Sequence, residues 1–242
     1  MKFLSSCIFV NLLCMALALP SYMSPRSHKK APGVPPASFS ADPSINVTGI
    51  YAAALASNTD MLASYPTTPG RKFIANIYGD WQNLENVSAF HFMANMDVDC
   101  DGPKEHCKGN RDGQPLTSFG ALDATQVPYF VLPERFTREF KSILKDNALG
   151  AIICDSQIVY GIYGDQNADR PEVIGEASIL IGQTCFPNGQ MNGGNGHSKN
   201  DVAYIVFGST VPPGIGRRTI DIQALKEIGD SQMKLLQTAL GL

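Results

Sequence analysis

The chain has 242 residues, of which 44% are hydrophobic and 17% charged, and its formal net charge is −3. This length is enough for one well-buried domain, and the composition excludes a chain that is disordered as a whole. The weakly acidic balance disfavours nucleic acid as a partner. The 22 glycines and 16 prolines are typical of a turn-rich β protein.

The first residues have the build of a secretory signal. One basic residue precedes an apolar run that ends in the small-x-small pattern Ala-Leu-Ala at 16–18. No later stretch reaches the roughly 18–20 apolar residues that a membrane-spanning helix needs. We therefore expect a secreted, extracellular protein without a membrane partner. Residues 1–18 are the expected signal peptide, 19–44 a Pro-rich linker or propeptide, and 45–242 the folded domain.

Short apolar or alternating segments bounded by Gly, Pro, Asn or Asp predict strands over most of the folded domain. The predicted strands are 73–78, 89–94, 129–132, 150–154, 158–163, 174–181 and 202–207. Helices are expected near 50–62 and 136–147. The apolar spacing of 221–240 predicts a closing helix, which Asp221 is suited to cap. The pattern indicates a mostly β, single-domain protein with a few peripheral helices, including this C-terminal one.

Four cysteines remain when the expected signal is removed: Cys100, Cys107, Cys154 and Cys185. An even number in an oxidising compartment predicts two disulfides, and three pairings are possible. We expect the local pair Cys100–Cys107 with the longer-range pair Cys154–Cys185. A zinc site is the competing interpretation, but the spacing Cys-x-x-Cys is absent.

Two carboxylates lie at the ends of neighbouring predicted strands. A strand at 159–163 and a partner at 175–181, joined by a polar turn, predict a hairpin that brings Asp165 near Glu176. Two carboxylates facing each other across a groove are the machinery of glycoside hydrolysis. Glu176, among apolar neighbours, is the better candidate for a raised pKa and the acid role, and Asp165 suits the base. The reverse assignment fits the spacing equally well.

A second acidic cluster precedes this pair. Asp97, Asp99 and Asp101 alternate along 96–102, and they share one face if the preceding strand continues. The spacing also resembles the start of a calcium-binding loop, but that loop needs an acid at its twelfth position, where this chain has Lys108. We favour a substrate-facing acidic patch, with a solvated turn as the alternative, and expect no metal.

Six short motifs follow one another between about residues 88 and 208. They are Ala-Phe-His-Phe at 89–92, Met-Asp-Val-Asp-Cys-Asp-Gly at 96–102, Tyr-Gly-Ile-Tyr-Gly-Asp at 160–165, Gly-Glu-Ala-Ser-Ile at 175–179, Cys-Phe-Pro-Asn at 185–188, and Gly-His with Asn-Asp-Val at 196–202. In this order the motifs resemble those of the fungal chitosanases of glycoside hydrolase family 75.

The resemblance implies endo-hydrolysis of β-1,4 linkages between glucosamine residues of chitosan, with inversion and without a cofactor. It implies that Asp165 and Glu176 are the essential pair, on a six-stranded, double-psi-like β-barrel. Chitosan is a polycation at mildly acid pH, so Asp97, Asp99 and Asp101 are candidates for binding its ammonium groups.

Two further residues are substrate-binding candidates. Tyr163 stands where relatives commonly have Trp, which weakens the expected stacking on a sugar ring, and Asp201 either orients substrate or caps a turn. The loop 166–174 between the two acids is expected to be about two residues longer than in relatives. His197 is expected to be structural or solvent-facing rather than catalytic.

Two other functional classes compete with a monomeric hydrolase. One is a catalytically silent polysaccharide-binding protein on the same fold, which the presence of both acids disfavours. The other is a calcium-stabilised, wall-associated structural protein, which the missing twelfth ligand disfavours.

Overall fold

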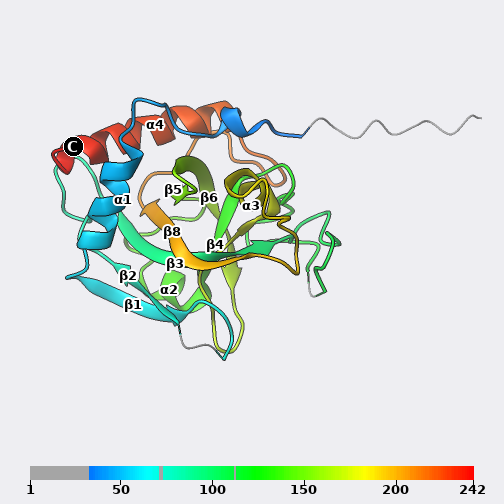
Figure 1. Cartoon of the computed structure of the whole chain (residues 1–242). Helices are drawn as coiled ribbons and strands as arrows, with labels where there is room; N and C mark the ends of the chain where they lie inside the picture. Colours follow the sequence, from blue (N-terminus) through cyan, green and yellow to red (C-terminus); the bar gives the residue numbers. More distant parts are fainter. Residues whose placement is uncertain (1–32, 71–72, 112) are drawn as a thin grey trace, which may run out of the picture. The chain divides into compact units, whose positions relative to one another are not determined.

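The computed structural model describes residues 33–70, 73–111 and 113–242 (Figure 1). Over these residues the chain forms eight strands, four α-helices and one short 3-10 helix. The strands are β1 Met61–Pro66, β2 Ile74–Tyr78, β3 Phe90–Asp99, β4 Tyr129–Pro133, β5 Leu149–Cys154, β6 Gln157–Asn167, β7 Glu176–Ser178 and β8 His197–Phe207. The helices are η1 Pro36–Ser38, α1 Val47–Ala56, α2 Glu134–Glu139, α3 Ile179–Cys185 and α4 Ile222–Ala239.

Six of the strands described here close into a barrel. The sheet order is β1-β2-β3-β7-β4-β6-β5-β8, and β3 also pairs with β8, which joins the two ends of the six-strand part. That closing pair is antiparallel and runs from Phe90 opposite Val206 to Met96 opposite His197. β1 and β2 extend the sheet beyond β3 as an antiparallel pair. The expected mostly β fold around a six-stranded barrel is confirmed.

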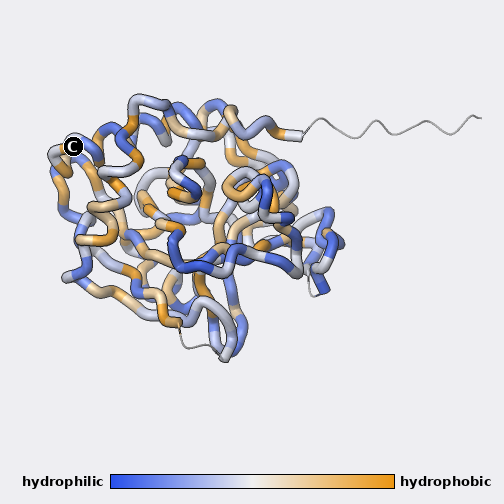
Figure 2. The backbone as a smooth tube through the Cα atoms, viewed as in Figure 1, coloured by the Kyte–Doolittle hydropathy of each residue, from blue (hydrophilic) through white to orange (hydrophobic). Residues whose placement is uncertain are grey.

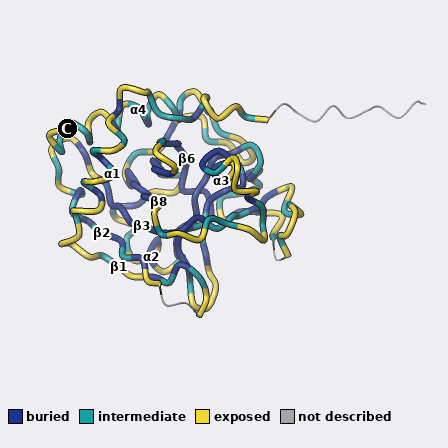
Figure 3. The backbone as a smooth tube through the Cα atoms, in the orientation of Figure 1, coloured by how far each residue is buried: buried dark blue, intermediate teal, exposed yellow. Residues whose placement is uncertain are grey.

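The barrel strands carry the core. All residues of β4 and β5 are buried, which explains why these segments are continuous apolar runs rather than alternating ones. Figure 2 shows these central strands as largely hydrophobic and Figure 3 shows them as buried, whereas the surrounding loops are polar and exposed. β8 changes character along its length, since residues 197–201 are mostly exposed and residues 202–207 are buried.

The closing helix α4 confirms the prediction for 221–240. The Asp221 side chain accepts a hydrogen bond from the backbone N–H of Ala224 at 3.0 Å and so caps the helix. Gly229 allows the helix to lie directly on β6, because a Cβ there would come within 2.6 Å of the Tyr160 ring. The Tyr160 hydroxyl donates to Asp230 Oδ1 at 2.8 Å, which ties helix and barrel together.

The predicted hairpin between 159–163 and 175–181 is wrong. β6 and β7 are not paired with each other, because β4 lies between them, parallel to β6 and antiparallel to β7. Burial is the physical reason. All residues of β4 are buried, and a strand that is apolar on both faces stabilises the barrel most when it has a partner on each side.

Other predicted segments change type or bounds. In the predicted strand 174–181, only the middle three residues form β7, and the chain then turns into α3. A short apolar run fits a buried strand and a buried helical turn equally well, so its periodicity cannot separate them. The predicted helix at 50–62 begins and ends earlier as α1, and its last residues belong to β1. The predicted helix at 136–147 is the shorter α2.

Residues 33–44, which were expected to belong to the linker, pack on the barrel. Phe39 is fully buried. Backbone hydrogen bonds of 2.8 and 3.0 Å join Phe39 and Ala41 to β6. The rest of the expected linker, 19–32, and the expected signal peptide, 1–18, lie outside the described residues.

Both predicted disulfides are confirmed, Cys100–Cys107 and Cys154–Cys185. The first closes a short loop directly after β3, and the second joins the end of β5 to the end of α3. Among the residues that the structure describes, no helix combines the length and the apolar character that crossing a membrane requires.

Candidate active site

A groove of about 510 Å³ lies where β3, β6 and β7 present their carboxylates. Six carboxyl groups line it: Asp97, Asp99, Asp101, Asp165, Asp169 and Glu176. Among the described residues that line this acidic groove there is no Lys, Arg or His. The groove therefore favours a cationic ligand over a neutral or anionic one.

Val131 of β4 sets the spacing between Asp165 and Glu176. It lies opposite Asp165 of β6 and, on its other side, opposite Glu176 of β7. Directly paired residues present their side chains on the same face of a sheet, so both carboxyls face the groove with Val131 between them. Two strand spacings of roughly 4.8 Å place their backbones roughly 9.6 Å apart. Asp97 of β3, opposite Glu176, continues the row.

Asp165 is buried and accepts three hydrogen bonds on one oxygen. Its Oδ1 accepts from the Ser118 N–H at 2.8 Å, the Ser118 hydroxyl at 2.7 Å and the Gln166 N–H at 2.7 Å. Burial raises the pKa of Asp165, and these three bonds, which stabilise the ionised form, oppose that rise. Because the donors from the described residues converge on Oδ1, Oδ2 is the oxygen left to face the groove.

Glu176 has the opposite electrostatic environment. Burial, followed by the charges of Asp99 and Asp97, raises its pKa well above the usual value for a glutamate. The Asn167 side-chain amide donates to Glu176 Oε2 at 3.1 Å. Since that oxygen accepts a hydrogen bond, the proton of the neutral acid belongs on Oε1.

The amide of Asn167 is itself held in one orientation. Its Oδ1 accepts from the backbone N–H groups of Val173 at 3.0 Å and Asp169 at 3.3 Å. The NH₂ group must therefore point the other way, toward Glu176. Asn167 is buried, and this fixed geometry makes it a positioning residue for the Glu176 carboxyl.

Asp99 and Asp101 form a turn at the end of β3. Asp99 Oδ1 accepts from the Asp101 N–H at 2.7 Å, and Asp101 Oδ1 accepts from the Gln114 N–H at 2.8 Å. The strand ends at Asp99, so only Asp97 and Asp99 share the predicted strand face. Burial, followed by the charge of Asp165, raises the pKa of Asp99 to about 8.

Carboxyl oxygens of Asp99, Asp101 and Asp165 lie within 4.8 Å of one another. Carboxylates this close repel one another when all are ionised. Oxygen ligands at such spacing suit a hard cation, and a proton shared among the carboxyls also relieves the repulsion. With its pKa at about 8, Asp99 supplies that proton at acid and neutral pH.

Tyr163 and Asp201 do not line the acidic groove. The Tyr163 side chain is 1% exposed, its ring meets Phe119 edge-on, and its hydroxyl accepts from Gln166 Nε2 at 2.6 Å. A ring this buried has no free face for a sugar, so the predicted stacking is wrong for this structure. Asp201 lies at a neighbouring cavity, where its Oδ1 is 2.6 Å from His197 Nε2.

Sequence reasoning missed Ser118 and Asn167. Ser118 lies 47 residues before Asp165 in the chain, and no local pattern marks it. Asn167 has a weak signal, because it comes two residues after Asp165 and ends β6, directly before the loop to Glu176.

A family described as fungal chitosanase of glycosyl hydrolase group 75 matches residues 96–237, which include all six acids of the groove. The chain is also similar to Endo-chitosanase C of Aspergillus oryzae, with 44% identity over 208 residues, covering 85% of this chain and 54% of that protein.

Two further relatives are more distant. An Endo-chitosanase of Aspergillus fumigatus is 35% identical over 147 residues, covering 54% of this chain and 61% of that protein. Endo-chitosanase B of Aspergillus oryzae (strain ATCC 42149 / RIB 40) is 35% identical over 159 residues, covering 56% and 65%. The chain thus spans about half the length of Endo-chitosanase C. The family match confirms the resemblance found in the sequence, and the chain belongs to the fungal chitosanase family of glycosyl hydrolase group 75.

Proposed function

We propose that this protein is a secreted, monomeric endo-chitosanase that hydrolyses the β-1,4 linkages between glucosamine residues with inversion. The observation that carries the proposal is the acidic groove, which has six carboxyl groups and, among its described residues, no cationic side chain. A glucosamine polymer brings one ammonium group per residue to such a groove. The names of the relatives and the two disulfides, which suit an oxidising compartment, support it.

In the proposed mechanism, Glu176 gives its proton to the leaving oxygen while Asp165 activates a water on the opposite face of the sugar. Glu176 suits the acid because its raised pKa keeps it protonated. Asp165 suits the base because three donors stabilise its ionised form. The backbone separation of roughly 9.6 Å across Val131 is compatible with the roughly 6.5–9.5 Å between carboxyls that leaves room for a water.

The remaining acids of the groove are proposed to bind substrate. Asp97 neighbours Glu176 in the strand register, and Asp99 and Asp101 lie beside Asp165. In this proposal Asp97 and Asp101 pair with ammonium groups of sugars on either side of the bond that is cleaved, and the protonated Asp99 hydrogen-bonds to the substrate. An acetylated unit has no ammonium group to pair with these acids.

The stereochemistry of the first product tests this function. Chitosan digested by the wild-type protein is expected to release the α anomer first, as seen by proton NMR before mutarotation, with a rapid fall in viscosity typical of endo-cleavage. A first-formed β anomer contradicts inversion. An absence of cleavage contradicts the function as a whole.

Ser118→Ala is expected to move the acidic limb of the pH–rate profile to higher pH. The Ser118 hydroxyl stabilises ionised Asp165, so its loss raises the pKa of Asp165, and the base is protonated over a wider range of acid pH. The plateau kcat is expected to fall by no more than about tenfold, since the two N–H donors remain. Ser64→Ala, which removes a hydroxyl on β1 outside the barrel, is the matched control. An unmoved acidic limb rules out Asp165 as the titrating base.

A further inference from the structure

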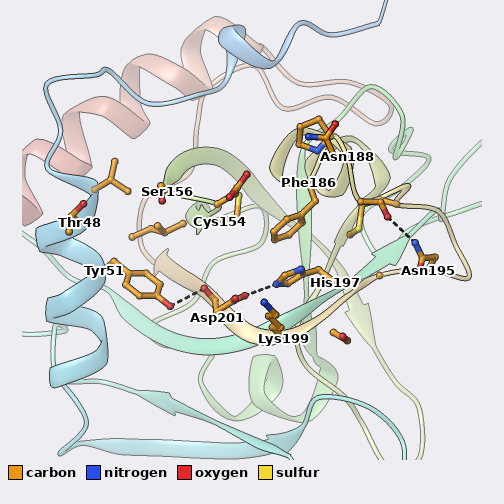
Figure 4. A pocket seen from close by; sticks show the side chains of 18 residues that line it. Thr48, Tyr51, Cys154, Ser156, Phe186, Asn188, Asn195, His197, Lys199 and Asp201 are labelled. Atoms are coloured by element: carbon orange, nitrogen blue, oxygen red, sulfur yellow. Dashed lines mark hydrogen bonds and ion pairs between the residues drawn. The ribbon is translucent and has the colours of Figure 1, made fainter.

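A second and larger cavity adjoins the acidic groove. It has a volume of about 820 Å³, and Asn195 and Gly196 line both it and the groove. Its walls come from α1, the turn between β5 and β6, the segment after α3, and the start of β8 (Figure 4). We call it the His197 cavity. It contains neither Asp165 nor Glu176.

Aromatic rings form one wall of the His197 cavity. The Phe186 ring lies against the His197 ring with centroids 3.9 Å apart and planes inclined by 10°. Tyr51 of α1 extends its ring into the same space, and its hydroxyl donates to the backbone oxygen of Asp201 at 3.0 Å. Figure 4 shows these three rings around one hollow. Flat rings next to a few fixed polar groups are typical of ligand sites.

Polar groups surround those rings. Asp201 Oδ1 is 2.6 Å from His197 Nε2, and this pair fixes the orientation of the imidazole. Asp155 is exposed at the tip of the turn between β5 and β6, and Asn188 adds an amide after α3. The exposed Lys199 also lines the cavity (Figure 4). The two carboxylates, the amides and the apolar rings together match a pyranose that carries hydroxyls and an ammonium group.

Two motifs from the sequence come together here. Residues 185–188 and 196–202 carry part of the family resemblance, yet apart from Gly196 they do not line the acidic groove. Phe186, Asn188 and His197 from these motifs all line the His197 cavity.

We propose that the His197 cavity is a second binding site for a β-1,4-linked glucosamine chain. Phe186 and Tyr51 pack against sugar rings, and Asp155 and Asp201 pair with ammonium groups. The volume exceeds that of a single sugar, and the shared wall at Asn195 and Gly196 lets one polymer reach both sites. The site holds chitosan close to the groove without taking part in bond cleavage. This inference rests on the proposed function for its ligand class.

The test measures binding directly, in the Glu176→Gln variant, which is not expected to consume its ligand. Titration with a glucosamine hexamer, followed by backbone amide NMR shifts, is expected to move signals of Asp155, Phe186 and Asn188 as well as signals of the groove. Cellohexaose has the same linkage without ammonium groups and is expected to bind the cavity about tenfold more weakly.

Two substitutions in the same background localise the site. Phe186→Ala is expected to weaken binding at the cavity roughly tenfold and to leave the groove isotherm unchanged. Asp155→Asn removes only the charge, because asparagine also tolerates the left-handed backbone of that turn (φ 44°). It is expected to preserve the fold, and so it tests the site even if Phe186→Ala fails to fold. Leu235→Ala on the exposed side of α4 is the control.

Cavity signals that do not move with the hexamer overturn the inference, as does an equal response to cellohexaose. Unchanged cavity binding in Asp155→Asn overturns the proposed pairing with ammonium groups. Cleavage of chitosan by the wild-type protein is measured separately. Cleavage without cavity binding defeats this inference alone, and absence of cleavage defeats the proposed function.

Discussion

Glu176→Gln is expected to lower kcat on chitosan by about a thousandfold or more, with little change in folding or in substrate binding. The glutamine keeps the size of the side chain, and its amide oxygen can accept the hydrogen bond from Asn167. Its NH₂ group is not acidic enough to protonate the leaving oxygen. Asp165→Asn is expected to cause a loss of similar size, because the amide cannot activate water.

A substrate with a different leaving group distinguishes the two variants. A glucosamine oligomer with an aryl leaving group needs little protonation, so Glu176→Gln is expected to regain much of its activity on it, whereas Asp165→Asn is not. Glu172→Gln, in the loop between the two acids and paired with Arg170, serves as the control and is expected to act like wild type. If Asp165→Asn is the variant that recovers, the two roles are reversed.

Asp99→Asn is expected to stabilise the folded protein at pH 8.5 and to have little effect at pH 4. Burial raises the pKa of Asp99 from 3.8 in the ordinary case to about 8, so the folded chain keeps a proton that the unfolded chain releases. Stability from this group is therefore fully present below about pH 4 and is lost as the pH rises through about 8. Asparagine removes the titration and can still accept from the Asp101 N–H.

Urea unfolding at the two pH values measures this effect. The free energy of unfolding is expected to rise by on the order of 2 kcal/mol at pH 8.5 relative to wild type. Asp146→Asn, at an exposed carboxylate outside the groove, is the control. Equal changes at pH 4 and pH 8.5 contradict the raised pKa of Asp99.

Local patterns in the sequence predicted the barrel strands, the closing helix and both disulfides. They also selected Asp165 and Glu176, which the structure places in one groove. The predicted pairing of two strands is wrong, because the register and the neighbours of a strand depend on contacts between distant segments, which the local hydrophobic period does not encode. The same limit hid Ser118, whose contact with Asp165 exists only after the barrel closes.

The position of Val131 determines where the chain can change in length without changing the spacing of Asp165 and Glu176. A strand, rather than the loop, fixes the distance between the two carboxyls. Insertions between Asp169 and Glu172 can therefore reshape the rim of the groove without moving either acid. The extra loop residues that the sequence led us to expect are compatible with an unchanged stereochemical outcome. Engineering of substrate preference can begin in that loop, because the strands and not the loop set the spacing of the two proposed catalytic carboxyls.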